Sequence, residues 1–272
     1  MKICIAGKNQ IAINSLRYLI DYLKIDHNDI YTCVNKNDKG IDSWQPSLLK
    51  FSIRNGIAVK SINELYNVKD LFFISLEFDQ IIKPSKFLSK NLFNIHFSIL
   101  PKYKGMYTSI FPILNGESAS GTTLHLIDSG IDTGDIIIQN EFEIDLQDTC
   151  RDLYFKYLKA GEDLFKNNIS SILNMNYSTE AQGWRNSSYF SKDSINFDNL
   201  SINLNRTSIN IHNQIRALIF QEYQLPKLRE SKIIESIFTG EKIEKNFFKK
   251  EKNSIELSGI DGYQIKLKTI HD

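Results

Sequence analysis

The triplet Asn94-Ile95-His96 is the first place in this chain where residue types and spacing suggest catalysis. It lies in an apolar run, Leu92 to Phe97, that predicts a β-strand, and alternation along a strand places Asn94 and His96 on one face. An amide N–H aimed at a carbonyl-type carbon can stabilise a developing oxyanion by about 3–4 kcal/mol. A neighbouring imidazole can accept the proton of an attacking amine, which contributes about 10²–10⁴-fold in rate. A lone histidine on a strand, however, is more often a structural residue.

Two further segments contain residues that suit such chemistry. Ser129 to Asp135 has two glycines around an Asp-Thr pair, which predicts a tight loop between strands. An ordinary solvated loop is one interpretation; the functional one places Asp132 beside His96, where a carboxylate favours the protonated imidazole and orients the ring. The turn from Leu100 to Gly105 carries two lysines, and it borders either an anionic ligand or solvent.

The elements that must position these residues alternate between strand and helix, which predicts right-handed crossovers and a mostly parallel sheet. Ligands of such sheets bind beyond the carboxyl ends of the strands, where Gly7-Lys8-Asn9 and Leu76 to Gln80 fall. The predicted strands are Lys2 to Ala6, Asp29 to Val34, Ile57 to Lys60, Asp70 to Leu76, Leu92 to Phe97, Thr122 to Leu126 and Asp135 to Ile144. The predicted helices include Ile11 to Leu23, Pro46 to Asn55, a short one begun by the Ser61–Glu64 capping box, one opened by Pro84, Ser109 to Leu114, and Asp148 to Asn167.

A second unit is expected after a polar connection over residues 170–200. It contains a helix from Ser208 to Phe220 and short strands, and Asp261-Gly262 between two alternating runs predicts a hairpin. The predicted fold is therefore α/β, with a Rossmann-like domain over residues 1–180 and a small C-terminal α+β unit, helix plus β-hairpin, over residues 200–272.

Composition excludes several classes of protein. The 272 residues are 42% apolar with a net charge of +1, so no strong field favours nucleic acid or an anionic membrane. Cys4, Cys33 and Cys150 are odd in number and widely spaced, which argues against a disulfide framework or a cysteine zinc site. With no signal peptide and no apolar run of about 18 residues expected, the sequence predicts a cytoplasmic protein.

The stretch from Phe93 to Ile137 reads N-I-H-F-S-I-L-P-K-Y-K-G, then I-L-N-G-E, then G-T-T-L-H-L-I-D-S-G-I-D-T-G-D-I-I. It closely resembles the formyltetrahydrofolate-dependent formyltransferases, which include the methionyl-tRNA and glycinamide ribonucleotide enzymes. The specific match covers about 45 residues, and the resemblance in fold extends to about residue 180. Proline is usual after the histidine of this family; Phe97 stands there instead, and we expect it to alter the shape of the loop and not the chemistry.

The resemblance implies a role for each matching residue. Asn94 and His96 correspond to the catalytic pair and Asp132 to the catalytic acid. The implied formyl donor is N10-formyltetrahydrofolate, attacked directly by a neutral amine without a metal or a covalent enzyme intermediate. Its pterin is expected along two segments, largely on backbone groups, with these residues as the predicted contacts: Leu76, Phe78, Ile81, Ser129 and Gly130.

Three segments, Gly7 to Asn9, Lys104 to Ser109 and His212 to Pro226, resemble the corresponding segments of the sugar N-formyltransferases. This resemblance implies a nucleotide-linked amino sugar as acceptor, most readily dTDP-4-amino-4,6-dideoxyglucose, and a surface polysaccharide such as O-antigen as the end product. It implies that Asn9 meets the pyrophosphate, Arg216 the diphosphate and Tyr223 the thymine ring. Both side chains suit these roles, because a guanidinium group pairs with phosphate oxygens and an aromatic face stacks on a base. A helix-surface charge at Arg216 and a packing role for Tyr223 are the alternatives. The sugar itself is expected to contact Glu77, Lys104, Met106 and Tyr107.

Other interpretations stay open. The sequence leaves undetermined the stereochemistry of the sugar, its amino position and whether the base is thymine or uracil. A methionyl-tRNA formyltransferase would need a basic surface, yet residues 201–272 contain twelve Lys or Arg and nine Asp or Glu. A non-catalytic folate or nucleotide-sugar binding module is disfavoured by the intact Asn94, His96 and Asp132. Ile233 to Phe238 and Tyr263 to Leu267 are candidate strands for a homodimer interface.

Overall fold

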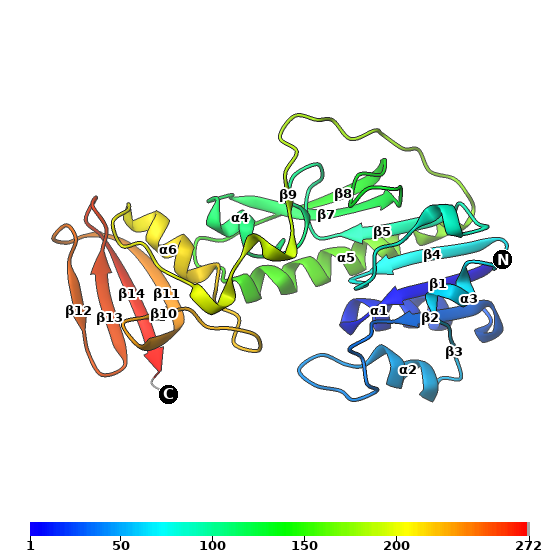
Figure 1. Cartoon of the computed structure of the whole chain (residues 1–272), viewed down its shortest axis with the longest axis horizontal. Coiled ribbons are helices and arrows are strands. Elements are labelled where there is room, and N and C mark those ends of the chain that lie inside the picture. Colours follow the sequence, from blue (N-terminus) through cyan, green and yellow to red (C-terminus); the bar gives the residue numbers. More distant parts are fainter. Residues whose placement is uncertain (271–272) are drawn as a thin grey trace. The chain divides into compact units, whose positions relative to one another are not determined.

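The computed structural model describes residues 1–270 and divides into two compact units (Figure 1). The first unit contains residues 1–104, 121–141 and 157–189. The second contains residues 105–120, 142–156 and the chain from Phe190 onward. It therefore includes two segments that precede the predicted boundary at residues 180–200.

A seven-stranded sheet forms the centre of the first unit, in the order β3-β2-β1-β4-β5-β7-β8. The first five strands pair in parallel, as predicted, and β7 runs antiparallel to β5. The strands are β1 (Lys2–Gly7), β2 (Ile30–Val34), β3 (Ala58–Val59), β4 (Leu71–Leu76), β5 (Leu92–His96), β7 (Ala119–Leu126) and β8 (Ile136–Glu143). Every residue of β4 is buried, which explains its continuous apolar run. The predicted α/β fold class is confirmed.

Short helices connect these strands. They are α1 (Asn9–Arg17), continued by a π-helical turn over Tyr18–Tyr22, α2 (Leu48–Arg54), α3 (Ile62–Leu65) and α4 (Phe111–Leu114). The predicted capping box is present: the Ser61 N–H donates to the Glu64 carboxylate at 2.8 Å. Pro84 opens only a 3₁₀ turn, Pro84–Lys86, and further 3₁₀ turns cover His27–Asp29, Lys192–Ser194 and Phe197–Asn199. The two-residue strands β6 (Lys104–Gly105) and β9 (Tyr189–Phe190) pair with each other.

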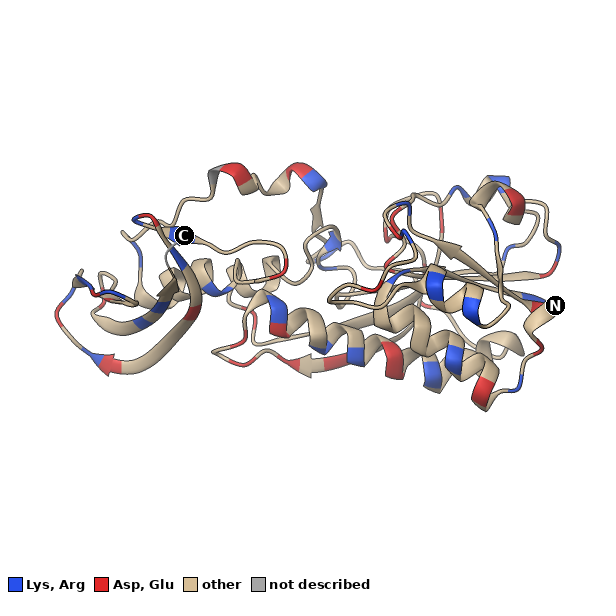
Figure 2. Ribbon diagram, turned by 90° about the horizontal axis from the view of Figure 1, so that it is seen from below, with Lys and Arg blue, Asp and Glu red and all other residues tan. Residues whose placement is uncertain are grey.

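The long helix α5 (Cys150–Leu173) is amphipathic. Leu153, Tyr157, Ala160 and Leu164 recur at helical spacing and are almost completely buried. Basic and acidic residues are interspersed along this helix (Figure 2), and Lys159 pairs with Asp163 at 2.7 Å. In the part of the chain that the structure describes, no helix has the length and apolar character to cross a membrane.

The second unit is built on a five-stranded antiparallel sheet in the order β10-β11-β14-β13-β12. Its strands are β10 (Lys227–Leu228), β11 (Ser231–Lys242), β12 (Phe248–Lys250), β13 (Ser254–Ser258) and β14 (Tyr263–Ile270), and α6 (Ser208–Arg216) ends four residues before the prediction. The predicted hairpin joins β13 to β14. Asp261 at its tip accepts hydrogen bonds from the N–H and the hydroxyl of Ser208, at 2.8 and 2.7 Å, and so caps α6.

One face of this sheet packs against α6. Ile211 and Ile215 of the helix share a buried cluster with Ile233, Ile265 and Leu267 of the strands. Each such side chain contributes about 1.5–3 kcal/mol on burial, so this cluster is the core of the second unit.

Candidate active site

Strand β5 places Asn94 and His96 at its carboxyl end, in the first unit. His96 is 8% exposed. The register with β7 sets Asn94 opposite His125 and His96 opposite Thr123. Phe97, the next residue, lies on the opposite face, where its ring stacks on Tyr157 of α5 with centroids 5.3 Å apart. Phe97 is therefore a packing residue for the long helix.

The side chain of Asp132 lies between those of Asn94 and His96. Its Oδ1 accepts a hydrogen bond from the Asn94 amide at 3.3 Å, and its Oδ2 is 3.4 Å from Nδ1 of His96. The structure thus brings together the three side chains that the sequence analysis selected, across 38 residues of chain.

The loop before β8 gives Asp132 this position. Asp132 has a φ of 54°, a left-handed conformation that costs a non-glycine residue about 1–3 kcal/mol. A Cβ on Gly134 would lie 1.8 Å from the Leu126 carbonyl oxygen, so only glycine fits there. Asp128 tightens the loop by accepting hydrogen bonds from the Thr133 hydroxyl and the Gly130 N–H, at 2.7 and 3.0 Å. The Gly-Ile-Asp-Thr-Gly spacing therefore serves the backbone geometry.

The contacts of His96 determine its protonation. Nε2 lies 2.8 Å from the carbonyl oxygen of Tyr103, which can only accept, so Nε2 carries a hydrogen and donates. In the neutral ring, Nδ1 then carries no hydrogen, and it faces the Asp132 carboxylate. Burial lowers the pKa of His96 from its ordinary value of 6.5, while Asp132 and the Tyr103 hydrogen bond oppose that shift. The arrangement is a neutral base beside a carboxylate that can stabilise the imidazolium.

His125 is a member of this cluster that the sequence analysis did not select. Its Nδ1 lies 2.7 Å from the Leu126 carbonyl oxygen, so Nε2 is the acceptor of the neutral ring and faces the Asn94 amide at 3.1 Å. Nε2 is also 3.6 Å from Asp132. In the sequence, His125 is recognisable only as a polar residue between Leu124 and Leu126 in a predicted strand. That it lies opposite Asn94 follows only from the pairing of β7 with β5.

The Asn94 amide is oriented by these two acceptors. One N–H can donate to His125 and the other to Asp132, and the reverse orientation would set its oxygen against a carboxylate. An oxyanion contact by Asn94 therefore requires one of these hydrogen bonds to be exchanged.

The other predicted residues of the first unit lie near the ends of β1 and β4. Asn9 donates to the Glu77 carboxylate at 3.2 Å, and both residues have positive φ, 61° and 58°. Leu76 is buried and Phe78 packs on Phe73, whereas Ile81 is 73% exposed. Ser129 and Gly130 are exposed on the Asp132 loop.

Lys104 is buried, contrary to a solvated position in its turn. Its Nζ donates to the Pro101 carbonyl at 3.2 Å and the Ser187 hydroxyl at 2.8 Å. Burial lowers the pKa of this ammonium, and Asp132 opposes the shift. Its contacts favour a structural role in the turn.

Four predicted substrate residues belong to the second unit: Met106, Tyr107, Arg216 and Tyr223. Met106 is 47% exposed. Arg216 is 3% exposed and donates to Asn213 and to the carbonyls of Asp145 and Asp148 at 2.7–3.0 Å. The helix-surface interpretation of Arg216 is wrong, and these bonds favour a structural role over the predicted diphosphate contact. The Tyr107 hydroxyl donates to the Lys192 carbonyl at 2.9 Å. Tyr223 is 59% exposed, which suits stacking on a base.

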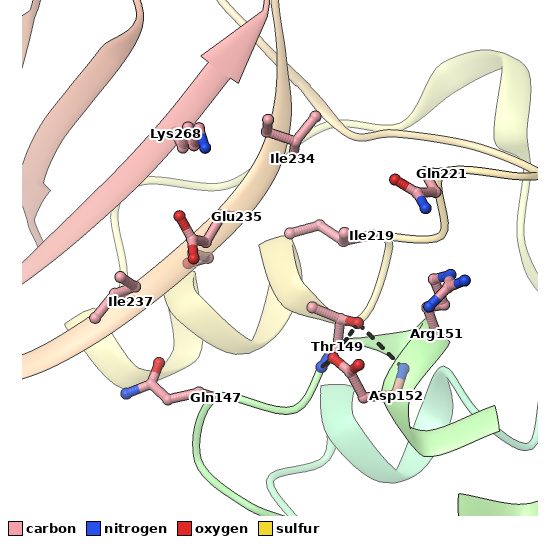
Figure 3. A pocket seen from close by; sticks show the side chains of 11 residues that line it. Gln147, Thr149, Arg151, Asp152, Ile219, Gln221, Ile234, Glu235, Ile237 and Lys268 are labelled. Carbon is pink, nitrogen blue, oxygen red and sulfur yellow. Dashed lines mark hydrogen bonds between the residues drawn. The ribbon is translucent and has the colours of Figure 1, made fainter. Parts of the chain in front are cut away.

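A pocket of about 370 Å³ lies within the second unit (Figure 3). The start of α5 contributes Thr149, Arg151 and Asp152, and the sheet contributes Glu235 and Lys268. The Asp152 carboxylate accepts hydrogen bonds from the Thr149 N–H and hydroxyl at 2.9 and 2.6 Å, so this helix end is already capped by an anion. The pocket has mixed charge and contains none of the predicted catalytic residues.

No group of three or more His, Cys, Asp or Glu side chains within residues 1–270 is arranged to hold a metal ion. The cysteine thiols are buried, and burial raises the pKa of Cys33 and of Cys150 to about 12.

Comparison with known proteins agrees with this geometry. The sequence profile of the formyl transferase family matches residues 61–169. A methionyl-tRNA formyltransferase of Finegoldia magna is 30% identical over 290 residues, which span 97% of this chain and 90% of the relative. The chain belongs to the formyl transferase family. Among solved structures, the sugar 3N-formyltransferase WlaRD is 55% identical, with a TM-score of 0.97 over 100% of this chain and 98% of that one.

A second solved formyltransferase, from Helicobacter canadensis, is 51% identical over 99% of this chain and 100% of that one, also with a TM-score of 0.97. The family expected from the Asn94-to-Gly134 motif is therefore confirmed.

Replacing either member of the predicted catalytic pair should abolish most of the activity. We expect Asn94→Ala and His96→Ala each to reduce kcat for formyl transfer at least about 100-fold, because oxyanion stabilisation or proton acceptance is lost. Steady-state kinetics measure this, with the exposed His27→Ala as control, for which we expect kcat within about twofold of the parent protein. Near-normal turnover in either variant would contradict the assignment.

The rate should depend on pH through His96. Because only the neutral ring can accept a proton, kcat/KM should fall as the pH is lowered through the pKa of His96, which lies below 6.5. Since Asp132 raises that pKa, Asp132→Asn should move the acid limb to still lower pH while reducing the maximum rate. A pH profile of kcat/KM for both proteins is the measurement, with the same acceptor so that protonation of its amine affects both profiles equally; an acid limb that Asp132→Asn leaves in place would exclude His96 as the base.

Proposed function

We propose that this protein transfers a formyl group from N10-formyltetrahydrofolate to the 3-amino group of a dTDP-linked 3-amino sugar. The observation that carries the proposal is the similarity over the whole chain to two solved sugar enzymes. WlaRD, a sugar 3N-formyltransferase, was solved in the presence of dTDP and 5-N-formyl-tetrahydrofolate. The Helicobacter canadensis enzyme was solved with folinic acid and dTDP-3-aminofucose.

The amino position is where these relatives add most to the sequence analysis. The sequence left the position open and favoured a 4-amino sugar. WlaRD, at 55% identity, is a sugar 3N-formyltransferase, and the Helicobacter canadensis enzyme, at 51% identity, was solved with a 3-amino sugar nucleotide. We therefore place the 3-amino sugar first and keep dTDP-4-amino-4,6-dideoxyglucose as the second acceptor.

The active site supports direct transfer. Asn94 can turn one N–H toward the formyl oxygen as negative charge develops there. His96 Nδ1 accepts a proton from the amine while the new C–N bond forms, and Asp132 stabilises the imidazolium. The C–N10 bond then breaks, and the proton held by His96 balances the reaction by passing to N10. The carrier thus leaves as tetrahydrofolate and the sugar leaves as a formamide.

Methionyl-tRNA is the alternative acceptor, supported by the 30% identity to the Finegoldia magna enzyme. This identity is lower than the 55% and 51% to the two sugar enzymes, which weighs against a tRNA acceptor. So does the charge of residues 201–272, where twelve basic and nine acidic side chains give only +3. Proteins that neutralise many phosphates usually carry a stronger bias.

A competition among acceptors tests the proposal. With N10-formyltetrahydrofolate as donor, we expect dTDP-3-aminofucose to react with a kcat/KM at least about 100-fold above that of dTDP-4-amino-4,6-dideoxyglucose, because a displaced amine loses its alignment for attack. Product would be identified by mass spectrometry. Exclusive formylation of initiator methionyl-tRNA would overturn the sugar assignment, and a preference for the 4-amino sugar would overturn the amino position.

We also propose that the protein is a homodimer that pairs through the five-stranded sheet. The sequence analysis pointed to Ile233 to Phe238 and Tyr263 to Leu267, yet Ile233, Ile265 and Leu267 lie in the unit's own core. On the opposite face Ile237 and Ile270 are 39% and 42% exposed. This face is the better candidate.

Light scattering after size exclusion tests the dimer. The parent protein should have twice the chain mass of 31.4 kDa, and Ile237→Lys should reduce it to one chain mass because a buried unpaired charge opposes association. A parent protein of a single chain mass would contradict the proposal.

A further inference from the structure

Gln182 lies in the polar connection after α5, yet it contacts the loop that carries Asp132. Its Nε2 donates to the carbonyl oxygens of Asp132 and Gly134, at 2.9 and 2.7 Å, across about 50 residues of chain. Its Oε1 is buried without a hydrogen-bond partner in the structure. The reverse orientation of this amide would set its oxygen against two carbonyl oxygens and lose both hydrogen bonds, so the two donated bonds fix its orientation.

Two backbone hydrogen bonds between Glu180 and Ile136, both 2.8 Å, fix Gln182 beside this loop. The loop needs such support. Asp132 has a φ of 54°, and a strained residue keeps its conformation only where the surrounding structure holds it. The two hydrogen bonds from Gln182 hold the backbone on both sides of Thr133, including the carbonyl of Asp132 itself.

Ser188, six residues later, contacts the turn that carries the other partner of His96. Its hydroxyl accepts from the Tyr103 N–H at 2.8 Å, its N–H donates to Pro101 at 3.2 Å, and its carbonyl accepts from Lys104 at 2.9 Å. Tyr103 also has a positive φ, 59°. The carbonyl of this same residue accepts the hydrogen bond from Nε2 of His96.

The two ring nitrogens of His96 thus face two left-handed residues, Asp132 and Tyr103, and one segment is hydrogen-bonded to both. We propose that the Gln182–Ser188 segment positions the catalytic residues: Gln182 sets the location of the Asp132 carboxylate, and Ser188 sets the Tyr103 carbonyl that orients the imidazole. Both are positioning residues that act through His96. The proposal rests on the catalytic roles proposed for His96 and Asp132.

Kinetics can separate positioning from general stability. Loss of positioning should lower kcat and leave KM nearly unchanged, because misplacement of the base acts on the transition state. A displaced Asp132 also raises the pKa of His96 less, so the acid limb of the pH profile should move to lower pH. A merely structural role would reduce the amount of active enzyme without moving that limb.

Two replacements of Gln182 test the first half. Gln182→Glu keeps the shape but sets a carboxylate against two carbonyl oxygens, and Gln182→Met removes the donors without adding charge. We expect both to lower kcat about 10–100-fold, to keep KM for both substrates within about threefold and to move the acid limb down by at least about half a pH unit. Normal kcat in both variants, or a lower kcat with an unmoved acid limb, would overturn the role of Gln182.

Two substitutions of Ser188 test its proposed role in setting the Tyr103 carbonyl. This test is independent of whether the Gln182 variants fold. Ser188→Ala should lower kcat about tenfold, whereas Ser188→Thr retains the hydroxyl and should restore at least about half of it. Ser170→Ala, on the exposed face of α5, is the matched control and should match the parent protein. Equal impairment of the Ala and Thr variants would overturn the role of Ser188. All assays use the acceptor that the parent protein formylates, so an error in the proposed sugar is detected separately.

Discussion

The contact of the Asp132 carboxylate with both Asn94 and His96 is the interaction on which the rest of the site depends. A carboxylate next to a largely buried imidazole is stable only if its backbone is held, since burial disfavours both charged forms. The fold meets this requirement with a strained residue at Asp132, a glycine at position 134 where no side chain fits, and donors from a distant segment. The proton affinity of His96 therefore depends on the backbone conformation of the loop that carries Asp132.

Local sequence patterns accounted for much of this arrangement. Alternation in β5 put Asn94 and His96 on one face, and the Gly-rich spacing around Asp132 indicated a tight loop; neither required knowledge of distant contacts. The parallel order of the first five strands likewise followed from the alternation of strand and helix. The capping box at Ser61 and the hairpin at Asp261-Gly262 were predictable because each depends on residues close in the sequence.

What could not be predicted depends on contacts between distant residues. His125 needs the antiparallel pairing of β7 with β5, and Gln182 reaches its partners across about 50 residues from a stretch without periodicity. The helix-surface alternative for Arg216 was wrong for a related reason. A helix reveals its apolar face in sequence, but the carbonyls of Asp145 and Asp148, which turn a charged side chain inward, belong to a segment near the start of α5.

The strand order of the second unit has a consequence for biosynthesis. β14 lies in the centre of the five-stranded sheet, between β11 and β13, although it follows all the other strands along the chain. The hairpin tip before it supplies the carboxylate that caps α6. Translation proceeds at about 5–20 residues per second, so α6 and β11 are synthesised on the order of seconds before β14, their central partner. Until then the edges of β11 and β13 lack the strand that separates them, and the second unit must complete its core after the first unit has been made.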